Sequence, residues 1–215
     1  MGFDKLTADL EGRPILAWSI STFNACAAID AIVLVCAAGT RAELEKIARI
    51  AAPDKLRAVV DGGAHRHLSV AEGLGCVPPD ASMIAVHDAA RPLVNCDMVE
   101  RCLESARNSG AAACARPVTD TLKRANNEGF IVESVDRQNL WSLETPQIFR
   151  AGLLRRAYAE VMAAGTPVTD ETSAVQAAGA PVALVATQEW NGKITYPGDL
   201  EVARLVARGR ATFVS

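Results

Sequence analysis

Two short segments of the chain combine glycines and charged side chains in a pattern suited to phosphate binding. In the first, Asp61–Val70, Gly62 and Gly63 allow the backbone to approach a ligand closely. Arg66 and Ser69 follow, and both can donate hydrogen bonds to phosphate or ribose oxygens near the beginning of a helix. A tight turn beside a solvated arginine would explain this segment equally well.

The second segment, His87–Pro92, directly follows a short apolar run. Asp88 is suited to hold a divalent cation or a substrate hydroxyl, and Arg91 is suited to pair with a phosphate. In open α/β sheets, ligands bind at the carboxyl ends of the strands, where this segment is expected to lie. We expect His87 to be a packed residue that supports the site and not a ligand.

Further hydroxyl-bearing and basic side chains are dispersed through the second half of the chain. They are Thr121, Lys123, Arg137, Thr145, Thr169 and Lys193. Such a set suits recognition of a phosphorylated polyol, because hydroxyls and cations donate hydrogen bonds to phosphate oxygens. Spacing alone does not establish this role, because residues 169–172 also fit a helix N-cap with an acidic first turn, and Lys193 fits a solvated surface lysine.

These candidates need elements that bring them together, and strand and helix patterns alternate along the chain. Short apolar runs predict strands at 31–36, 56–60, 83–86, 111–115, 182–186 and 193–195. Helices are predicted after Pro14, after Thr40 as an N-cap, and at 69–74, 97–108 and 197–208. This alternation predicts one Rossmann-like α/β domain over residues 1–215, with a mostly parallel sheet and helices on both faces.

A polar segment at residues 118–140 interrupts the alternation. The turn-forming sequence Asn126–Gly129 lies at its centre, between the extended flanks Asp120–Arg124 and Phe130–Val135. The segment is therefore predicted to be a β-hairpin arm that projects from the sheet.

Composition excludes several classes of partner. The chain has 215 residues, half of them apolar, and a net charge of −3, which gives no argument for nucleic-acid binding. No apolar run is long enough to span a membrane, so no membrane partner is expected. The six cysteines lack metal-binding spacing and are expected to be mostly core residues of a cytoplasmic protein.

Taken in order, the motifs resemble those of the 2-C-methyl-D-erythritol 4-phosphate cytidylyltransferase family. The matching segments are Gly62–Val70, His87–Pro92, Asp120–Lys123, Val135–Arg137, Thr145–Gln147, Thr169–Glu171 and Lys193–Thr195. The resemblance implies a nucleotidyltransferase fold and transfer of CMP from CTP to methylerythritol phosphate, with release of pyrophosphate, in non-mevalonate isoprenoid biosynthesis. It also implies Mg²⁺ as cofactor and a homodimer formed through the hairpin arm.

The resemblance further implies a role for individual residues. Those implied for CTP binding are Gly62, Gly63, Arg66, Ser69 and Ala89. Those implied for binding the sugar-alcohol phosphate are Thr121, Arg137, Thr145 and Thr169, of which Thr121 and Arg137 would act in the neighbouring subunit. Those implied for catalysis are Lys5, Asp88, Arg91 and Lys193, with Asp88 also beside Mg²⁺.

The beginning of the chain departs from the family pattern. Family members open with a strand and a glycine-rich phosphate loop, whereas Met1 here stands where that loop would end. We expect Met1 to be an internal methionine of a longer, more stable chain. A fragmentary sequence and a naturally short protein are the alternatives. Cys36–Arg41 imitates such a loop only superficially. Two other interpretations remain: a cytidylyltransferase for another polyol phosphate, and a non-catalytic, truncated homologue that binds a phosphorylated ligand.

Overall fold

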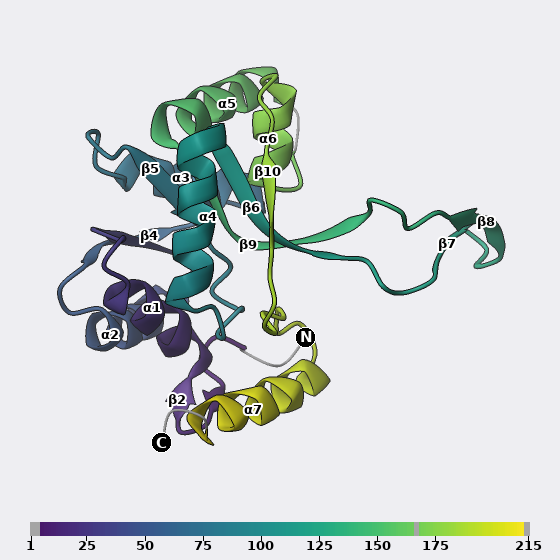
Figure 1. The fold of residues 1–215 in the computed structure, drawn as a ribbon. Helices are drawn as coiled ribbons and strands as arrows, with labels where there is room; N and C mark the ends of the chain where they lie inside the picture. The colour runs from purple at the N-terminus through teal and green to yellow at the C-terminus, as the bar shows by residue number, and fades with distance from the viewer. Residues whose placement is uncertain (1–4, 166–167, 213–215) are drawn as a thin grey trace.

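A four-stranded sheet lies at the centre of the molecule (Figure 1). The computed structural model describes residues 5–165 and 168–212. The strand order is β10 (Ala183–Ala186), β6 (Ala111–Pro117), β9 (Trp141–Arg150) and β5 (Met83–Val86). Strands β10 and β6 pair in parallel, whereas β9 is antiparallel to both of its neighbours. Three strands therefore run in one direction, as the predicted sheet requires. The sequence did not predict β9, which returns from the arm directly beside β6.

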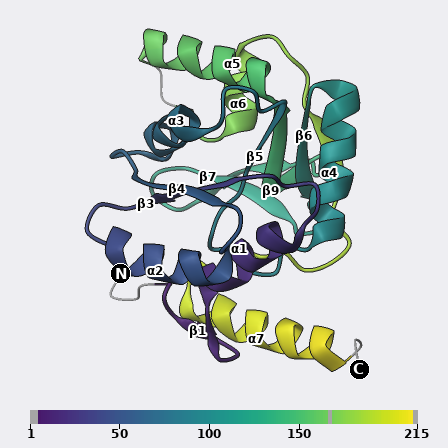
Figure 2. The ribbon, with the colours of Figure 1, turned by 90° about the vertical axis from the view of Figure 1, so that its left-hand side faces the viewer.

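Helices cover both faces of this sheet, as predicted (Figure 2). Helix α4 (Cys96–Ser109) packs on one face in a cluster that includes Ile148. Helices α3 (Arg66–Cys76), α5 (Ala151–Ala164) and α6 (Glu171–Ala177) contribute to a second cluster around Phe149. Ile148 and Phe149 are consecutive on β9, and successive strand residues point to opposite faces, so this strand joins the two cores.

A separate two-stranded sheet pairs β3 (Ile32–Cys36) with β4 (Leu56–Asp61) in parallel. Helices α1 (Ile15–Ala25) and α2 (Arg41–Ala51) share its apolar cluster. Among the described residues, no ladder connects this pair with the four-stranded sheet.

The two ends of the described chain meet below these sheets. Strands β1 (Asp9–Leu10) and β2 (Arg13–Pro14) form a short hairpin. Helix α7 (Pro197–Thr212) packs against it through a cluster that includes Leu10 and Leu200. None of the helices in the described ranges is long and apolar enough to cross a membrane.

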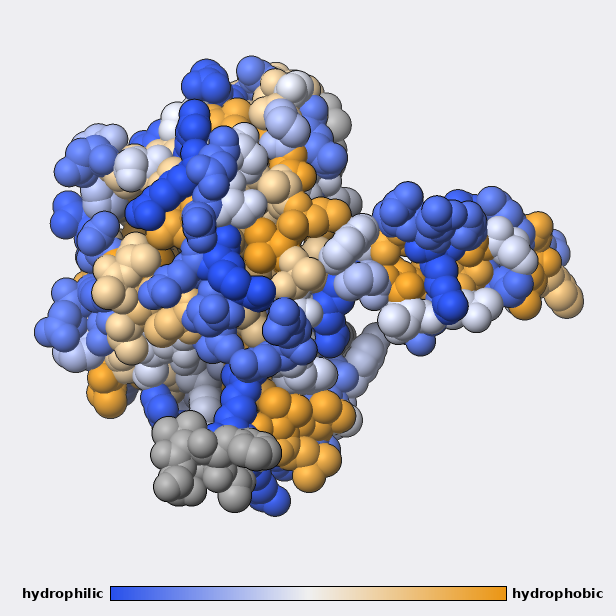
Figure 3. All heavy atoms as spheres, in the orientation of Figure 1, coloured by the Kyte–Doolittle hydropathy of each residue, from blue (hydrophilic) through white to orange (hydrophobic). Residues whose placement is uncertain are grey.

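The predicted hairpin arm is confirmed. Strands β7 (Leu122–Ala125) and β8 (Ile131–Val135) pair in antiparallel fashion and extend far from the body of the molecule (Figure 1). Gly129 has φ 87°, which a glycine adopts without strain. Apolar side chains gather at the outer end of the arm (Figure 3), where Phe130, Ile131 and Val132 are 68%, 68% and 59% exposed.

Three local predictions were wrong. Helix α3 begins at Arg66 and not at Ser69, so both residues lie on the helix. Thr40 does not cap α2, because its hydroxyl donates to the Ala37 carbonyl instead. Residues 193–195 form no strand; Ile194 makes one backbone hydrogen bond, to Ala90, where a ladder was expected.

Candidate functional site

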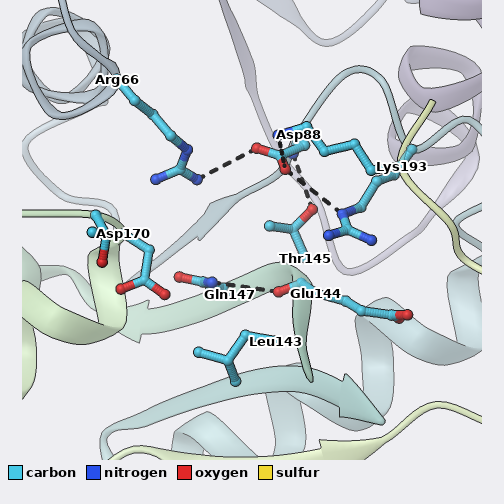
Figure 4. Close-up of a pocket in the computed structure, with 10 residues that line it drawn as sticks. Arg66, Asp88, Leu143, Glu144, Thr145, Gln147, Asp170 and Lys193 are labelled. Atoms are coloured by element: carbon cyan, nitrogen blue, oxygen red, sulfur yellow. Dashed lines mark hydrogen bonds and ion pairs between the residues drawn. The ribbon is translucent and has the colours of Figure 1, made fainter. Parts of the chain in front are cut away.

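A polar cavity of about 190 Å³ opens at the carboxyl end of β5, where the sequence predicted a site (Figure 4). Its walls come from the beginning of α3, the loop after β5, the middle of β9, the segment before α6 and the segment before α7. The lining residues are Arg66, Asp88, Arg91, Leu143, Glu144, Thr145, Gln147, Thr169, Asp170 and Lys193.

Asp88 is the electrostatic centre of this cavity. Its Oδ2 atom lies 3.0 Å from Lys193 Nζ and 3.6 Å from Arg91 Nε, and its Oδ1 atom lies 3.4 Å from Arg66 Nη2. Burial by itself raises the pKa of Asp88, but the charges of Lys193, Arg66 and Arg91 outweigh it and lower that pKa overall. Three cationic side chains therefore converge on one carboxylate, and such a set of charged donors suits an anionic ligand.

A hydrogen-bond chain through His87 fixes the loop that carries Asp88. The Asp88 amide donates to Thr145 Oγ1 at 3.0 Å, and that hydroxyl lies 3.0 Å from His87 Nδ1. His87 Nε2 lies 3.1 Å from the Arg91 carbonyl, which can only accept. We therefore assign the proton to Nε2, so that Nδ1 accepts from the Thr145 hydroxyl. His87 thus supports the site, as the sequence predicted.

The state of His87 predicts a pH dependence of stability. Burial lowers the pKa of His87 from 6.5 to about 4. Between these values the unfolded chain binds more protons than the folded one, so the free energy of unfolding should fall as pH drops from 6.5 towards 4, by up to about 3 kcal/mol. Urea titrations at several pH values would measure this.

The control for this prediction is His87→Gln, in which the amide can still donate to the Arg91 carbonyl but does not titrate. Its unfolding free energy should change much less than that of the wild type over the same pH interval. Parallel pH profiles for the two proteins would contradict the assignment of a neutral His87.

Asn191 attaches the Lys193 segment to β9. It is fully buried, and its Nδ2 atom donates to the Thr145 carbonyl at 2.8 Å and lies 3.3 Å from Glu144 Oε2. The Asn191 carbonyl accepts from Arg91 Nη1 at 2.9 Å. A Cβ atom on Gly192 would lie 2.2 Å from the Trp190 ring, so only glycine fits between Asn191 and Lys193. These contacts place the Lys193 ammonium over Asp88.

Glu144 lies beneath the cavity as a second buried carboxylate, only 3% exposed. Its Oε1 atom pairs with Arg116 Nε at 3.0 Å, and its Oε2 atom accepts from Thr187 Oγ1 at 3.1 Å. This carboxylate is occupied by its own partners, which leaves Asp88 as the acid that faces the three cations.

Asp170 has a structural task at the beginning of α6. Its side chain accepts from the Ser173 amide at 2.9 Å, the Ser173 hydroxyl at 2.7 Å and the Thr172 hydroxyl at 2.9 Å. Burial raises its pKa, but these hydrogen bonds more than compensate and lower it overall. The N-cap predicted for residues 169–172 is confirmed, and it places Thr169 at the cavity wall.

The structure brings six of the predicted site residues to the cavity. These are Arg66, Asp88, Arg91, Thr145, Thr169 and Lys193. Gly62, Gly63 and Ser69 do not line it. The two glycines precede α3, and Ser69 lies in its first turn. A Cβ atom added to Gly62 would lie 2.6 Å from Ser69 Oγ, and one added to Gly63 would lie 2.4 Å from Leu68 Cβ. Close packing against α3 therefore accounts for both glycines, and Ala89 lies in the loop after β5 without lining the cavity.

Three further predicted site residues also do not line the cavity of this single chain: Lys5, Thr121 and Arg137. Thr121 and Arg137 are exposed at the arm, and Arg137 donates to the Thr119 carbonyl. Sequence reasoning named none of Leu143, Glu144, Gln147 and Asp170 as a site residue, although Gln147 and Asp170 lie in segments that match the family, and all four line the cavity. The signal for them was the group of polar residues at 144–147 within a segment otherwise suited to a strand.

Comparisons with known proteins agree on one family. A family model described as 2-C-methyl-D-erythritol 4-phosphate cytidylyltransferase matches residues 1–208. The chain is 38% identical over 202 residues to the cytidylyltransferase of that name from Desulforamulus reducens, covering 94% of this chain and 86% of the relative. It is 40% identical over 212 residues to that of Acidobacterium capsulatum, covering 95% and 87%. The crystal structure of the Thermus thermophilus protein of that name superposes with a TM-score of 0.80 at 35% identity, covering 95% of this chain and 93% of the other.

Proposed function

The chain belongs to the 2-C-methyl-D-erythritol 4-phosphate cytidylyltransferase family, and we propose that it transfers CMP from CTP to 2-C-methyl-D-erythritol 4-phosphate. The products are 4-diphosphocytidyl-2-C-methyl-D-erythritol and pyrophosphate, in non-mevalonate isoprenoid biosynthesis. The observation that carries the proposal is the group of three cations around Asp88 in a cavity at the end of β5, where anionic substrates would be held.

The proposed reaction is an in-line displacement at phosphorus. A phosphate oxygen of the acceptor attacks the α-phosphorus of CTP, the bond from that phosphorus to the bridging oxygen breaks, and pyrophosphate leaves. The attacking oxygen is already anionic, so no general base is needed. Catalysis then consists of positioning the two phosphates and stabilising the developing negative charge, a task suited to Arg66, Arg91 and Lys193.

The two substrates are proposed to occupy different sides of the cavity. The CTP side would use Gly62, Gly63, Arg66, Ser69 and Ala89. The acceptor side would use Arg91, Thr145, Thr169 and Lys193, which bring two cations and two hydroxyl oxygens to the cavity wall. Lys5 is proposed to stabilise charge on the triphosphate.

Mg²⁺ is the proposed cofactor, and the donor set at the cavity fits it. Magnesium sites in nucleotide enzymes commonly use one or two carboxylates together with substrate phosphates. Asp88 supplies such a carboxylate, and no group of three or more His, Cys, Asp or Glu side chains in the described ranges could form an all-protein metal site. When bound, the ion would neutralise negative charge on the phosphates.

We further propose that the chain acts as a homodimer in the cytoplasm. The arm carries the exposed apolar residues Phe130, Ile131 and Val132 far from the body, where burial against a second copy would stabilise them. Thr121 and Arg137 would then act in the neighbour's cavity. Six free cysteines are typical of a protein from a reducing compartment.

Replacing both Phe130 and Ile131 with serine should convert a dimer into a monomer, because it removes apolar area from the outer end of the arm. Sedimentation velocity would measure this. The matched control is Ile50→Ser, which removes an exposed apolar side chain, 84% accessible, on α2. A wild-type monomer, or a dimer that persists in the arm variant, would contradict the proposal.

Pyrophosphate release from CTP, methylerythritol phosphate and Mg²⁺ tests the activity. Ribitol and glycerol phosphates in the same assay test the alternative acceptors, which the cations of the cavity could also bind. Methylerythritol phosphate should give the highest kcat/KM. Preference for another polyol phosphate would shift the assignment to that substrate, and binding of CTP without any turnover would favour a non-catalytic homologue.

A further inference from the structure

Arg66 connects the cavity with a buried carboxylate behind it. Its Nη2 atom lies 3.4 Å from Asp88 Oδ1, whereas its Nη1 atom donates to Glu171 Oε1 at 2.6 Å. Hydrogen bonds between a guanidinium and a carboxylate weaken steeply as they lengthen, so Glu171 is the stronger anchor of the two. The Arg66 side chain is 34% exposed and lines the cavity with the part that its two carboxylate partners leave open (Figure 4).

Glu171 is fully buried and does not line the cavity. Burying a carboxylate is costly unless it is paired and hydrogen-bonded. Its Oε1 atom accepts from both Arg66 and the Tyr158 hydroxyl, the latter at 2.9 Å, while its Oε2 atom has no hydrogen-bond partner among the described residues. Arg66 therefore provides the only positive charge paired with Glu171 in the described chain.

Tyr158 donates a hydrogen bond to the Glu171 carboxylate from within the apolar core. It lies on α5, is only 3% exposed, and packs in the same apolar cluster as Leu154 and Val175. Burial and the nearby charge of Glu171 raise the pKa of Tyr158, so the hydroxyl remains a donor at neutral pH. A tyrosine set in a packed core restricts the position of the carboxylate to which it donates.

We infer that Glu171 and Tyr158 are positioning residues that hold the Arg66 guanidinium at the cavity wall independently of Asp88. Asp88 is shared with Lys193 and Arg91, so its contact with Arg66 can change when a phosphate ligand or a cation enters. The contact with Glu171 lies behind the cavity and does not need to change. The inference rests on the proposed function only in taking CTP as the ligand that Arg66 meets.

The first test is a double-mutant cycle on catalysis. Glu171→Gln keeps the size of the side chain but removes its charge, and we expect a tenfold to thirtyfold loss of kcat/KM for CTP, mainly through a higher KM. In an Arg66→Ala background, Glu171→Gln should change kcat/KM less than threefold, because Arg66, which Glu171 is inferred to position, is already absent. Equal losses in both backgrounds, or a lower melting temperature with unchanged kcat/KM, would overturn the inference.

Matched controls separate positioning from general disturbance. Glu160→Gln changes an exposed glutamate on α5, and Tyr196→Phe changes the other tyrosine of the chain, which is 65% exposed. Both should leave kcat/KM within twofold of the wild type. Tyr158→Phe should lower kcat/KM threefold to tenfold, and it keeps the inference falsifiable if Glu171→Gln does not fold. No loss in Tyr158→Phe would overturn the role of Tyr158.

A crystal structure of the Glu171→Gln protein tests the position of Arg66 directly and does not depend on catalytic activity. The Arg66 guanidinium should leave its place between Asp88 and position 171 in the Glu171→Gln protein. If it stays there, the inference fails even where the proposed reaction is confirmed. If it moves and the wild type shows no cytidylyl transfer, the positioning role holds and the proposed function fails.

Discussion

Lys193→Ala should lower kcat/KM for pyrophosphate release by roughly a hundredfold to a thousandfold, a range typical of removing one preorganised donor from a transition state. The Lys193 ammonium lies 3.0 Å from Asp88 Oδ2 at the cavity wall, and its side chain is 39% exposed. The substitution would remove one of the three cations that are proposed to stabilise the negative charge developing on the transferred phosphoryl group. Because the side chain is partly exposed, the melting temperature should change little.

Two variants sharpen this prediction. Lys193→Arg retains the charge but not the compact ammonium, and it should recover only part of the activity. Lys46→Ala removes an exposed lysine on α2 and should leave kcat/KM unchanged. Turnover in Lys193→Ala close to that of the wild type would remove Lys193 from the catalytic group.

Glu144→Ala should lower the free energy of unfolding by about 2 kcal/mol, because it removes the acceptor of a buried donor and the charged partner of Arg116. The substitution leaves Arg116 without its 3.0 Å partner and removes the acceptor of one Asn191 Nδ2 contact. The Thr187 hydroxyl loses one of its two acceptors and keeps the Ala115 carbonyl at 3.3 Å. Buried donors without acceptors keep the full cost of desolvation. Urea denaturation of the two proteins would measure the difference.

The comparison for Glu144 is an ion pair on the surface. Glu201 lies 2.5 Å from Arg204 on α7, but its side chain is 68% exposed. Exposed pairs contribute little, so Glu201→Ala should cost less than about 1 kcal/mol. Equal costs for the two substitutions would show that the Glu144 network does not stabilise the fold.

Some elements followed from local sequence alone. Residues 83–86 form strand β5 as predicted, because four consecutive apolar residues fit a strand covered on both faces. The turn at Asn126–Gly129 formed the predicted hairpin, since its glycine requires positive φ. Asp170 caps α6 through its own side chain, which is a contact within three residues.

Other elements escaped prediction for physical reasons. Strand β9 carries Glu144, Thr145 and Gln147 within its buried stretch, and these polar residues interrupt the apolar pattern of a strand. Their burial is possible only because distant residues such as Arg116 and Asn191 hydrogen-bond to them. Residues 193–195 alternate as a strand does, but the fold uses them to attach a segment to the loop after β5.

The sequence by itself determined the chemistry that the chain offers: its cations, its hydroxyls, the acid Asp88 and the motifs of the family. Only the tertiary structure decided which of these groups share a cavity. Arg66 and Glu171 are 105 residues apart, and Arg91 and Asn191 are 100 apart, yet each pair is in hydrogen-bond contact. Periodicity reports local backbone conformation and the buried face of an element, whereas contacts between distant residues arise when the elements pack together.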